Sequence, residues 1–315
     1  MRVVFLGSGA FGLPTLAHLA RSHDITGVVT QPDRPAGRGG KVSPTPVGAW
    51  VDANLPGVPL FKPERINVTE AANAVRALGA DAWVVIAFGQ KLGKALLADR
   101  FAVNLHASLL PRWRGAAPIN AAILAGDTRT GNSVITLADR MDAGLVLGTS
   151  ERAIEPALTA GELHDLLAAD GPALVERVIE AHAGGTLSPV VQSESLVTLA
   201  PKLSRADAWV DFSQPADECR RRINGLSPWP GVTVEFRGQP LKLLRASHAP
   251  APARDLGTVG TIIDPVQGVI RCGGDTALAL IEVQPAGKKP GLWRDFANGQ
   301  RLGPQEALLG GRPPC

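Results

Sequence analysis

Short apolar runs alternate with helix-like segments through the first part of the chain. The strand-like runs are 3–6, 25–30, 82–87 and 101–105, and the helix-like segments are 15–21, 95–97, 119–124 and 163–182. This order is typical of an α/β domain with a Rossmann-like, mainly parallel sheet. Ligands of such sheets bind beyond the carboxyl ends of the strands, so the chemistry is expected there.

A different pattern follows the last helix-like segment. Residues 184–201 are rich in Gly, Ser, Thr and Pro with weak periodicity, so we expect a linker over 185–206 between a first domain at 1–184 and a second at 207–315. The second domain contains short β-rich segments between Gly or Pro turns, at 231–236, 240–246, 257–263, 268–272 and 277–284. This spacing predicts a small OB-like β-barrel, a kind of fold that binds oligonucleotides.

The composition is typical of a globular protein in a reducing compartment. The 315 residues carry moderate charge, and the three cysteines are far apart, without the spacing of a metal site or a disulfide framework. The first apolar residues stop at a glycine-rich turn, and no run is long enough to span a membrane. We therefore expect a cytoplasmic protein without a signal peptide and without membrane contact.

The formal net charge of +3 is unevenly distributed. From Pro201 onward 15 Lys and Arg stand against 11 Asp and Glu, whereas the preceding part has 17 against 18. A basic C-terminal part fits binding to a phosphate backbone, but at this size a solvated surface explains it equally well.

The candidate chemistry lies where the run 101–105 ends. Asn104 and His106 are two residues apart, so the period of a strand points both side chains the same way. Pro111 and Gly115 then turn the chain into a loop. For an isolated Asn-x-His, a turn-capping asparagine beside a core histidine would explain the pair without any function.

The longer run is more specific. Residues 104–119 read NLHASLLPRWRGAAPI and continue to Asp127, and this stretch closely resembles the signature of the 10-formyltetrahydrofolate-dependent formyltransferases, in particular the methionyl-tRNA formyltransferases. The resemblance covers the chain from Phe5 to about residue 302. It implies that Asn104 and His106 act with an aspartate in a downstream Met-Asp-x-Gly loop, which is Asp142 here. Asp139 precedes the methionine and falls outside that motif.

The resemblance also implies the reaction and its co-substrate. Formyl transfer needs hydrogen-bond donors for the oxygen of a tetrahedral intermediate, and an asparagine amide and an imidazole supply them. By resemblance, 10-formyltetrahydrofolate binds in a pocket built from residues 83–90 and from the loop that carries Asp142. The candidate contact residues are Phe88, Gly89, Gln90, Ser108, Leu109, Leu110 and Pro111.

Two competing motifs are weaker. Gly7, Gly9 and Gly12 match a dinucleotide fingerprint, but the next strand lacks the terminal acidic residue that would bind ribose, since Asp33 follows a proline in a loop. An NAD-linked oxidoreductase is therefore disfavoured, and the glycines also suit close helix packing. Ser108 near His106 could suggest a hydrolase, but the Gly-x-Ser-x-Gly elbow is missing. The other histidines show no metal-ligand pairing, so we expect no metal.

Three stretches favour initiator methionyl-tRNA as the formyl acceptor. The second domain is one of them, because by resemblance a short ribonucleotide transformylase would end near the linker. The other two are basic loops that by resemblance contact tRNA, with Arg34, Arg38 and Lys41 in the first and Lys288 and Lys289 in the second. The alternatives are a UDP-sugar formyltransferase and a non-enzymatic tRNA-binding protein. We expect a monomer.

Overall fold

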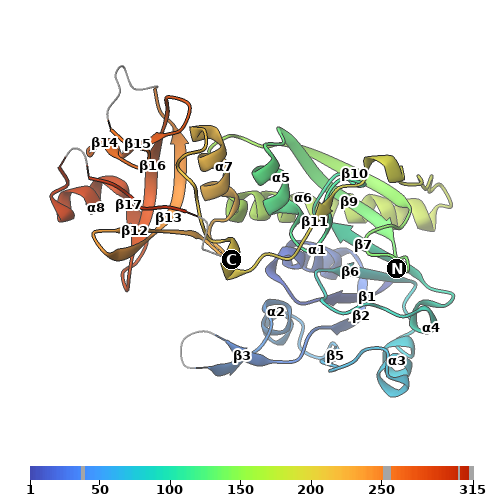
Figure 1. Cartoon of the computed structure of the whole chain (residues 1–315). Coiled ribbons are helices and arrows are strands. Elements are labelled where there is room, and N and C mark those ends of the chain that lie inside the picture. The colour runs from blue at the N-terminus through green and yellow to red at the C-terminus, as the bar shows by residue number, and fades with distance from the viewer. Residues whose placement is uncertain (37–39, 251–256, 304–305, 312–315) are drawn as a thin grey trace. The chain divides into compact units, whose positions relative to one another are not determined.

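The computed structural model describes residues 1–36, 40–250, 257–303 and 306–311 (Figure 1). The chain forms two compact units. The first consists of residues 1–114, 131–152 and 164–198, and the second of residues 115–130, 153–163 and 199–315.

The secondary structure is mixed. The strands are β1 (Arg2–Gly7), β2 (Asp24–Val29), β3 (Arg34–Ala36), β4 (Lys41–Ser43), β5 (Leu60–Phe61), β6 (Ala82–Ile86), β7 (Phe101–His106), β8 (Arg114–Gly115), β9 (Arg129–Thr136), β10 (Val146–Ala153), β11 (Leu199–Ala200), β12 (Val232–Phe236), β13 (Gln239–His248), β14 (Ile262–Asp264), β15 (Val269–Cys272), β16 (Thr276–Pro285) and β17 (Gly291–Leu292). The helices are α1 (Leu13–Ser22), α2 (Pro46–Asn54), α3 (Thr69–Arg76), α4 (Lys94–Leu97), α5 (Pro118–Ala125), α6 (Ala160–Ala183), α7 (Ala216–Gly225) and α8 (Trp293–Gln300), with short 3₁₀ turns at Ala10–Gly12, Glu194–Leu196 and Arg205–Asp207.

The first unit is built on a seven-stranded sheet in the order β10-β9-β7-β6-β1-β2-β5. The pairs β1–β2, β1–β6, β2–β5 and β6–β7 are parallel, and β9 runs antiparallel to β7. The predicted α/β fold with a mainly parallel sheet is confirmed.

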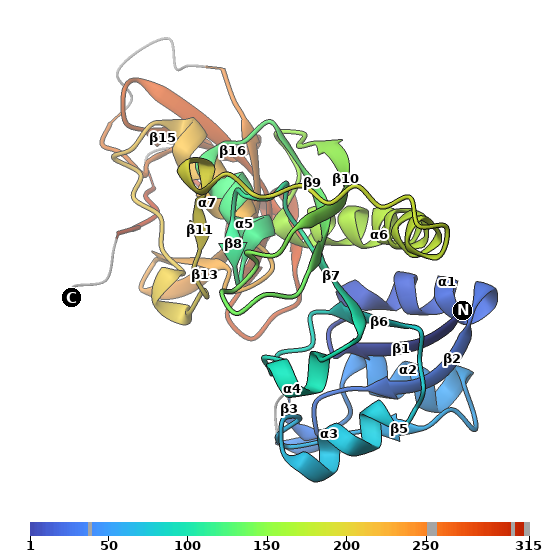
Figure 2. The ribbon, with the colours of Figure 1, turned by 90° about the vertical axis from the view of Figure 1, so that its right-hand side faces the viewer.

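Alternate residues of the central strands bury opposite faces of the sheet. Val4 and Leu6 of β1 belong to a core with Val75 of α3 and Leu96 of α4. The two-residue strand period turns Phe5 to the opposite face. Figure 2 shows α1 and α3 on opposite sides of β1, β2 and β6. Both faces of the sheet are covered, which explains why its strands read as continuous apolar runs.

The glycine-rich turn after β1 is required by packing. A Cβ atom on Gly7 would lie 2.8 Å from the carbonyl oxygen of Ile86, and one on Gly12 would lie 3.0 Å from the ring of Phe5. The hydroxyl of Ser8, between them, donates to the carbonyl oxygen of Phe88 and accepts from the backbone N–H of Gln31. Gly7 and Gly12 therefore allow neighbouring chain segments to pack closely, as expected if the glycine motif serves helix packing.

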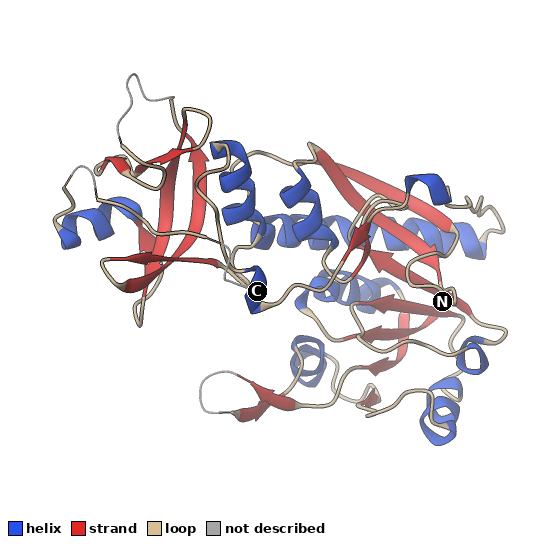
Figure 3. Cartoon of the chain, in the orientation of Figure 1, coloured by secondary structure: helices blue, strands red, loops and turns tan. Residues whose placement is uncertain are grey.

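The second unit is an antiparallel β structure, in which strands dominate (Figure 3). Its sheet runs β12-β13-β16-β15-β14, with β17 beside β16. Leu309 pairs with Glu235 of β12, and Ala307 pairs with Thr261 at the start of β14, so residues 306–309 join the two edges of the sheet. The predicted C-terminal β domain is confirmed, and this late segment completes its barrel-like closure.

Two details of the sequence interpretation differ from the structure. The segment 257–263 was expected to be one strand, but β14 begins only at Ile262, because residues 257–260 form turns in which Gly257 and Gly260 have φ values of 101° and 85°. The strands β9 and β10 were not predicted. None of the helices among the described residues is long and apolar enough to cross a membrane.

Candidate active site

Two polar side chains occupy the carboxyl end of β7. Asn104 lies opposite Val85 of β6 and Ile135 of β9, and His106 lies opposite Ser133 of β9. Asn104 is half-buried, whereas His106 is 7 % exposed. Among the described residues, no hydrogen-bond partner engages the Asn104 carboxamide. The structure therefore places this amide, with its two N–H donors, at the sheet edge where a ligand is expected.

The imidazole of His106 is held between a carbonyl group and a carboxylate. Its Nε2 lies 2.9 Å from the carbonyl oxygen of Trp113, and its Nδ1 lies 3.6 Å from Oδ2 of Asp142. Because a carbonyl oxygen only accepts, Nε2 carries a proton in this arrangement. Nδ1 is then the ring nitrogen that faces Asp142.

Asp142 lies in the loop between β9 and β10. Its backbone is left-handed, with φ of 52°, a conformation that needs support from its surroundings for a residue other than glycine. A Cβ atom on Gly144 would lie 1.7 Å from the carbonyl oxygen of Thr136, so only glycine fits at that position. The base of the loop is closed by hydrogen bonds between Thr136 and Leu145.

Asp139, in the same loop, is separate from this pair. Its carboxylate lies 2.7 Å from the amino group of Lys94, and both side chains are largely exposed. The structure thus brings Asp142, and not Asp139, to His106.

The loop after β7 is fixed by the hydroxyl groups of two buried serines. Ser108 donates to the carbonyl oxygen of Arg112 at 2.6 Å. Ser133 accepts from the N–H of Leu110 and donates to the carbonyl oxygen of Ser108. The Ser108 hydroxyl is thereby committed to its own loop, which argues against a hydrolytic nucleophile. Leu109 and Pro111, two of the predicted folate contacts, are half-buried in this loop.

The other predicted folate residues follow β6, the strand next to β7. Phe88 is buried, and its carbonyl oxygen accepts from Ser8 and from the side chain of Gln31. Gly89 has φ of 89°. The side chain of Gln90 accepts from the N–H of Ile66 and donates to the carbonyl oxygen of Pro63. The hydrogen bonds of Phe88 and Gln90 thus fix the conformation of the loop after β6.

The segment after α6 contributes site residues that the sequence interpretation assigned to a linker. Gln192 is buried and bonds both the loop of Asp142 and the guanidinium of Arg114, while Glu194 accepts from Arg114 and Arg140. Hydrogen bonds from Arg140 and then Arg114 lower the pKa of Glu194 below its ordinary value. The local sequence gave no signal for these roles, because the partners of Gln192 and Glu194 are distant in the chain.

The predicted tRNA contacts lie on exposed surface. Arg34 forms an ion pair at 2.5 Å with Glu64, both exposed, and Lys41 is exposed on the hairpin that β3 and β4 form. Arg38 lies outside the described residues. Lys288 and Lys289 are exposed in the turn between β16 and β17 of the second unit.

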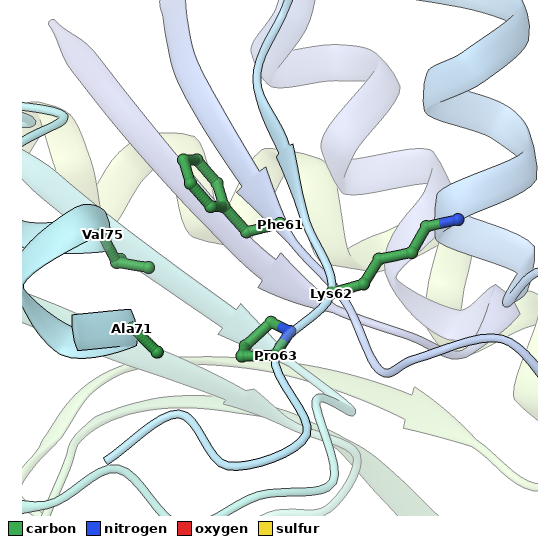
Figure 4. Close-up of a pocket in the computed structure, with 5 residues that line it drawn as sticks. All are labelled: Phe61, Lys62, Pro63, Ala71 and Val75. Carbon is green, nitrogen blue, oxygen red and sulfur yellow. The ribbon is translucent and has the colours of Figure 1, made fainter. Parts of the chain in front are cut away.

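A separate hollow of about 240 Å³ lies beside β5 (Figure 4). It is lined by Phe61, Lys62, Pro63, Ala71 and Val75, and Lys62, its one charged residue, is paired with Asp33 at 2.9 Å. It contains none of the groups at the end of β7, so it is not the candidate active site. Within the part of the chain that the structure describes, no cluster of three His, Cys, Asp or Glu side chains could hold a metal ion.

Comparison with known families agrees with this geometry. Residues 1–179 match the model described as formyl transferase, and residues 202–301 match the formyl transferase C-terminal domain. The methionyl-tRNA formyltransferase of Magnetococcus marinus is 41 % identical over 313 residues, which cover 96 % of this chain and 98 % of the relative. The chain belongs to the methionyl-tRNA formyltransferase family. The enzyme of the same name from Symbiobacterium thermophilum is 40 % identical, over 98 % of this chain and 97 % of the relative.

Solved structures show that the formyltransferase fold extends to distant proteins. HypX from Aquifex aeolicus in complex with tetrahydrofolic acid aligns with a TM-score of 0.64 at 16 % identity, over 97 % of this chain and 48 % of that one. The sugar 3N-formyltransferase WlaRD aligns with a TM-score of 0.67 at 12 % identity, over 92 % and 99 %. At these identities the likeness concerns the fold alone. The resemblance inferred from the sequence is confirmed by the full-length relatives.

Proposed function

We propose that this protein transfers the formyl group of 10-formyltetrahydrofolate to the α-amino group of methionyl-initiator-tRNA, giving formylmethionyl-tRNA for translation initiation. The observation that carries the proposal is the His106–Asp142 pair at the end of β7, in a chain about 40 % identical over its length to methionyl-tRNA formyltransferases. A silent tRNA-binding protein would not need Asn104, His106 and Asp142 together.

In the proposed reaction the amine nitrogen attacks the formyl carbon, and the C=O electron pair moves onto oxygen. The carboxamide of Asn104 donates an N–H to that oxyanion. Since the Trp113 carbonyl holds Nε2, Nδ1 is the nitrogen of His106 on the side of Asp142, and in the imidazolium form its N–H is the proton donor.

Collapse of the tetrahedral intermediate re-forms the C=O bond and breaks the bond to the folate nitrogen, which leaves with a proton. Asp142 accepts the proton that the attacking amine loses, and His106 donates the proton that the leaving nitrogen gains. The reaction is an acyl transfer without net oxidation, so we propose no role for NAD, and the donors named above act without a metal.

We propose that the folate lies against the loop after β6, at Phe88, Gly89 and Gln90, and against the loop after β7, at Ser108, Leu109, Leu110 and Pro111. Support comes from the parallel pairing of β6 and β7, which brings the carboxyl ends of both strands to one edge of the sheet.

For the tRNA we propose two basic contacts, at Arg34, Arg38 and Lys41 and at Lys288 and Lys289. Substitution of each group by alanine should weaken tRNA binding most at low salt, and the defect should shrink as salt rises, because each lost phosphate contact lowers the salt slope by about one. Binding measured across a salt series checks this, and an unchanged slope would remove the group from the proposed interface.

The assay that tests the function offers the wild-type enzyme 10-formyltetrahydrofolate with methionyl-initiator-tRNA, and in parallel with an amino-sugar nucleotide. Formylation of the tRNA supports the proposal. Formylation of the sugar nucleotide alone would replace it with the sugar formyltransferase alternative.

Three further properties complete the proposal. The protein acts as a monomer in the cytoplasm, and its functional domains are a catalytic domain at 1–184, a linker at 185–206 and a tRNA-binding domain at 207–315. Light scattering at assay concentration tests whether the protein is a monomer.

A further inference from the structure

The two loops that hold the His106–Asp142 pair are joined by one short segment. Residues 192–198, here called the strap, follow the pairing of Val190 with Val146, whose two backbone hydrogen bonds are each 2.8 Å long. The described members of the strap belong to the same compact unit as His106 and Asp142.

Gln192, at the start of the strap, uses every polar atom of its side chain. Its Nε2 donates to the carbonyl oxygens of Asp142 at 2.7 Å and Gly144 at 2.8 Å. Its Oε1 accepts from Nε of Arg114 at 2.9 Å. Only a carboxamide supplies two donors and one acceptor in this way, and the shorter side chain of asparagine lacks one methylene of the reach.

These bonds act on the part of the loop that orients the catalytic carboxylate. Asp142 has a left-handed backbone, and Gln192 bonds the carbonyl groups on either side of Ala143. Such a conformation persists where surrounding contacts determine it, so Gln192 is suited to hold the carboxylate in place.

The same strap reaches the loop that holds the imidazole. The N–H of Trp113 donates to Oγ1 of Thr198 at 2.9 Å, and the N–H of Arg114 donates to the Thr198 carbonyl oxygen at 2.9 Å. The carbonyl group of Trp113 is the one that fixes Nε2 of His106. Both partners of the His106–Asp142 pair are therefore braced by one segment.

We propose that Gln192 is a positioning residue for formyl transfer, which acts through the strap by setting the separation of the His106 imidazole and the Asp142 carboxylate. Only the expected loss of formyl transfer activity rests on the proposed function. The expected change in the position of the His106 imidazole relative to the Asp142 carboxylate concerns the protein alone and can be tested without substrate.

The kinetic test compares wild type with Gln192→Met and Gln192→Glu in the full chain. Methionine keeps the length of the side chain and removes all three hydrogen bonds. Glutamate keeps the acceptor for Arg114 but sets an oxygen against the two carbonyl groups of the Asp142 loop. We expect kcat to fall on the order of a hundredfold in both, with KM for tRNA unchanged, because a misplacement near 1 Å costs about that much. Gln267→Met, at an exposed glutamine of the second unit, is the matched control.

The second readout is the ¹⁵N spectrum of the histidine rings, assigned for His106 with a His106→Gln variant. Gln192→Met should shift the His106 ring nitrogens and leave the five other histidines in place. Thr198→Val is a nearly isosteric change at a half-buried residue at the other end of the strap, and it should shift the same His106 resonances. If neither Gln192 variant folds, Thr198→Val takes their place in this test.

A lower melting temperature with unchanged kcat and unchanged His106 resonances would overturn the proposal and leave the strap a purely structural element. Shifted resonances in an enzyme that does not formylate the tRNA would support the positioning role while refuting the proposed function.

Discussion

Two carboxylates lie three residues apart in the loop between β9 and β10, in very different surroundings. The side chain of Asp142 is 14 % exposed and faces His106, whereas that of Asp139 is 62 % exposed and pairs with Lys94. Lys94 lowers the pKa of Asp139 by a hydrogen bond, so this carboxylate is a stable surface anion. Substitutions of Asp139 and Asp142 can therefore be compared within one loop, with Asp139 as the control.

Asp142→Asn should lower kcat for formyl transfer by about a hundredfold or more, because an amide keeps the shape but cannot accept the proton from the amine. Asp139→Asn should leave kcat near the wild-type value. Steady-state kinetics with methionyl-initiator-tRNA measures both. Equal losses in the two variants would mean that the loop, and not the Asp142 carboxylate, sustains activity.

The sequence predicts individual residues well where a local rule places them. Asn104 and His106 follow from the strand period, and Asp142 was implied by the family motif. Gln192 was out of reach, because its role depends on groups 50 and 78 residues away, at Asp142 and Arg114. The same segment lies in the proposed linker at 185–206, where Gly, Ser and Pro residues leave no periodicity that would single out Gln192.

Among the elements, α6 begins with a capping box that also contains an ion pair. Thr159 is the N-cap residue, its N–H and hydroxyl donate to Glu162 at 2.9 Å each, and Arg245 donates to the other oxygen of Glu162. Burial alone would raise the pKa of Glu162, but the bonds from Arg245 and Thr159 outweigh it and lower this pKa below 4.5.

A carboxyl group whose pKa is lowered in the folded state stabilises the fold at pH values above the pKa that it has in the unfolded chain. This stability is lost as the pH falls through the pKa of the folded state. Glu162→Ala should therefore reduce the free energy of unfolding by about 1 kcal/mol at pH 7, the usual cost of a lost cap. The difference from wild type should vanish at a pH well below 4.5. Denaturant unfolding at both pH values measures it.

Glu180→Ala, at an exposed position of the same helix, is the control and should show little effect at either pH. A Glu162→Ala defect that persisted undiminished in acid would show that the carboxylate charge is not its cause.

At the element scale, apolar periodicity predicts the central strands but not the edge of the sheet. The observed β1, β2, β6 and β7 each lie within two residues of the expected runs. The strand β9 was missed because it buries Thr130, Asn132 and Ser133, which break the apolar pattern. Their burial is offset by contacts distant in sequence, such as the bond from Asn132 to the carbonyl oxygen of Leu167.

At the scale of the whole molecule, the second unit is closed by residues 306–309, which lie near the end of the chain. Leu308 is 1 % exposed in the core of this unit, and its neighbour Leu309 is 62 % exposed. The same core contains Cys219 and Cys272, each 1 % exposed. A hydrogen bond with Cys272, and then burial, raise the pKa of Cys219 far above its ordinary value, so its thiol stays protonated.

The two thiols should therefore react with a thiol reagent only when the second unit opens. In a Cys315→Ser background, Leu308→Ala should destabilise this unit by about 2–5 kcal/mol and speed labelling accordingly. Leu309→Ala, one residue further on, should label at the wild-type rate. Identical rates for the two leucine variants would show that residues 306–309 do not hold the unit closed.

The strap also limits where this chain can be recombined with a relative. A hybrid joined within residues 185–189 would take its Asp142 loop from one parent and the bracing Gln192 from another. A junction after Thr198 would instead keep the strap with both loops that it bonds, at Asp142 and at Trp113. The position of a junction within the proposed linker at 185–206 therefore matters, and hybrids joined after Thr198 should be more active than hybrids joined at 185–189.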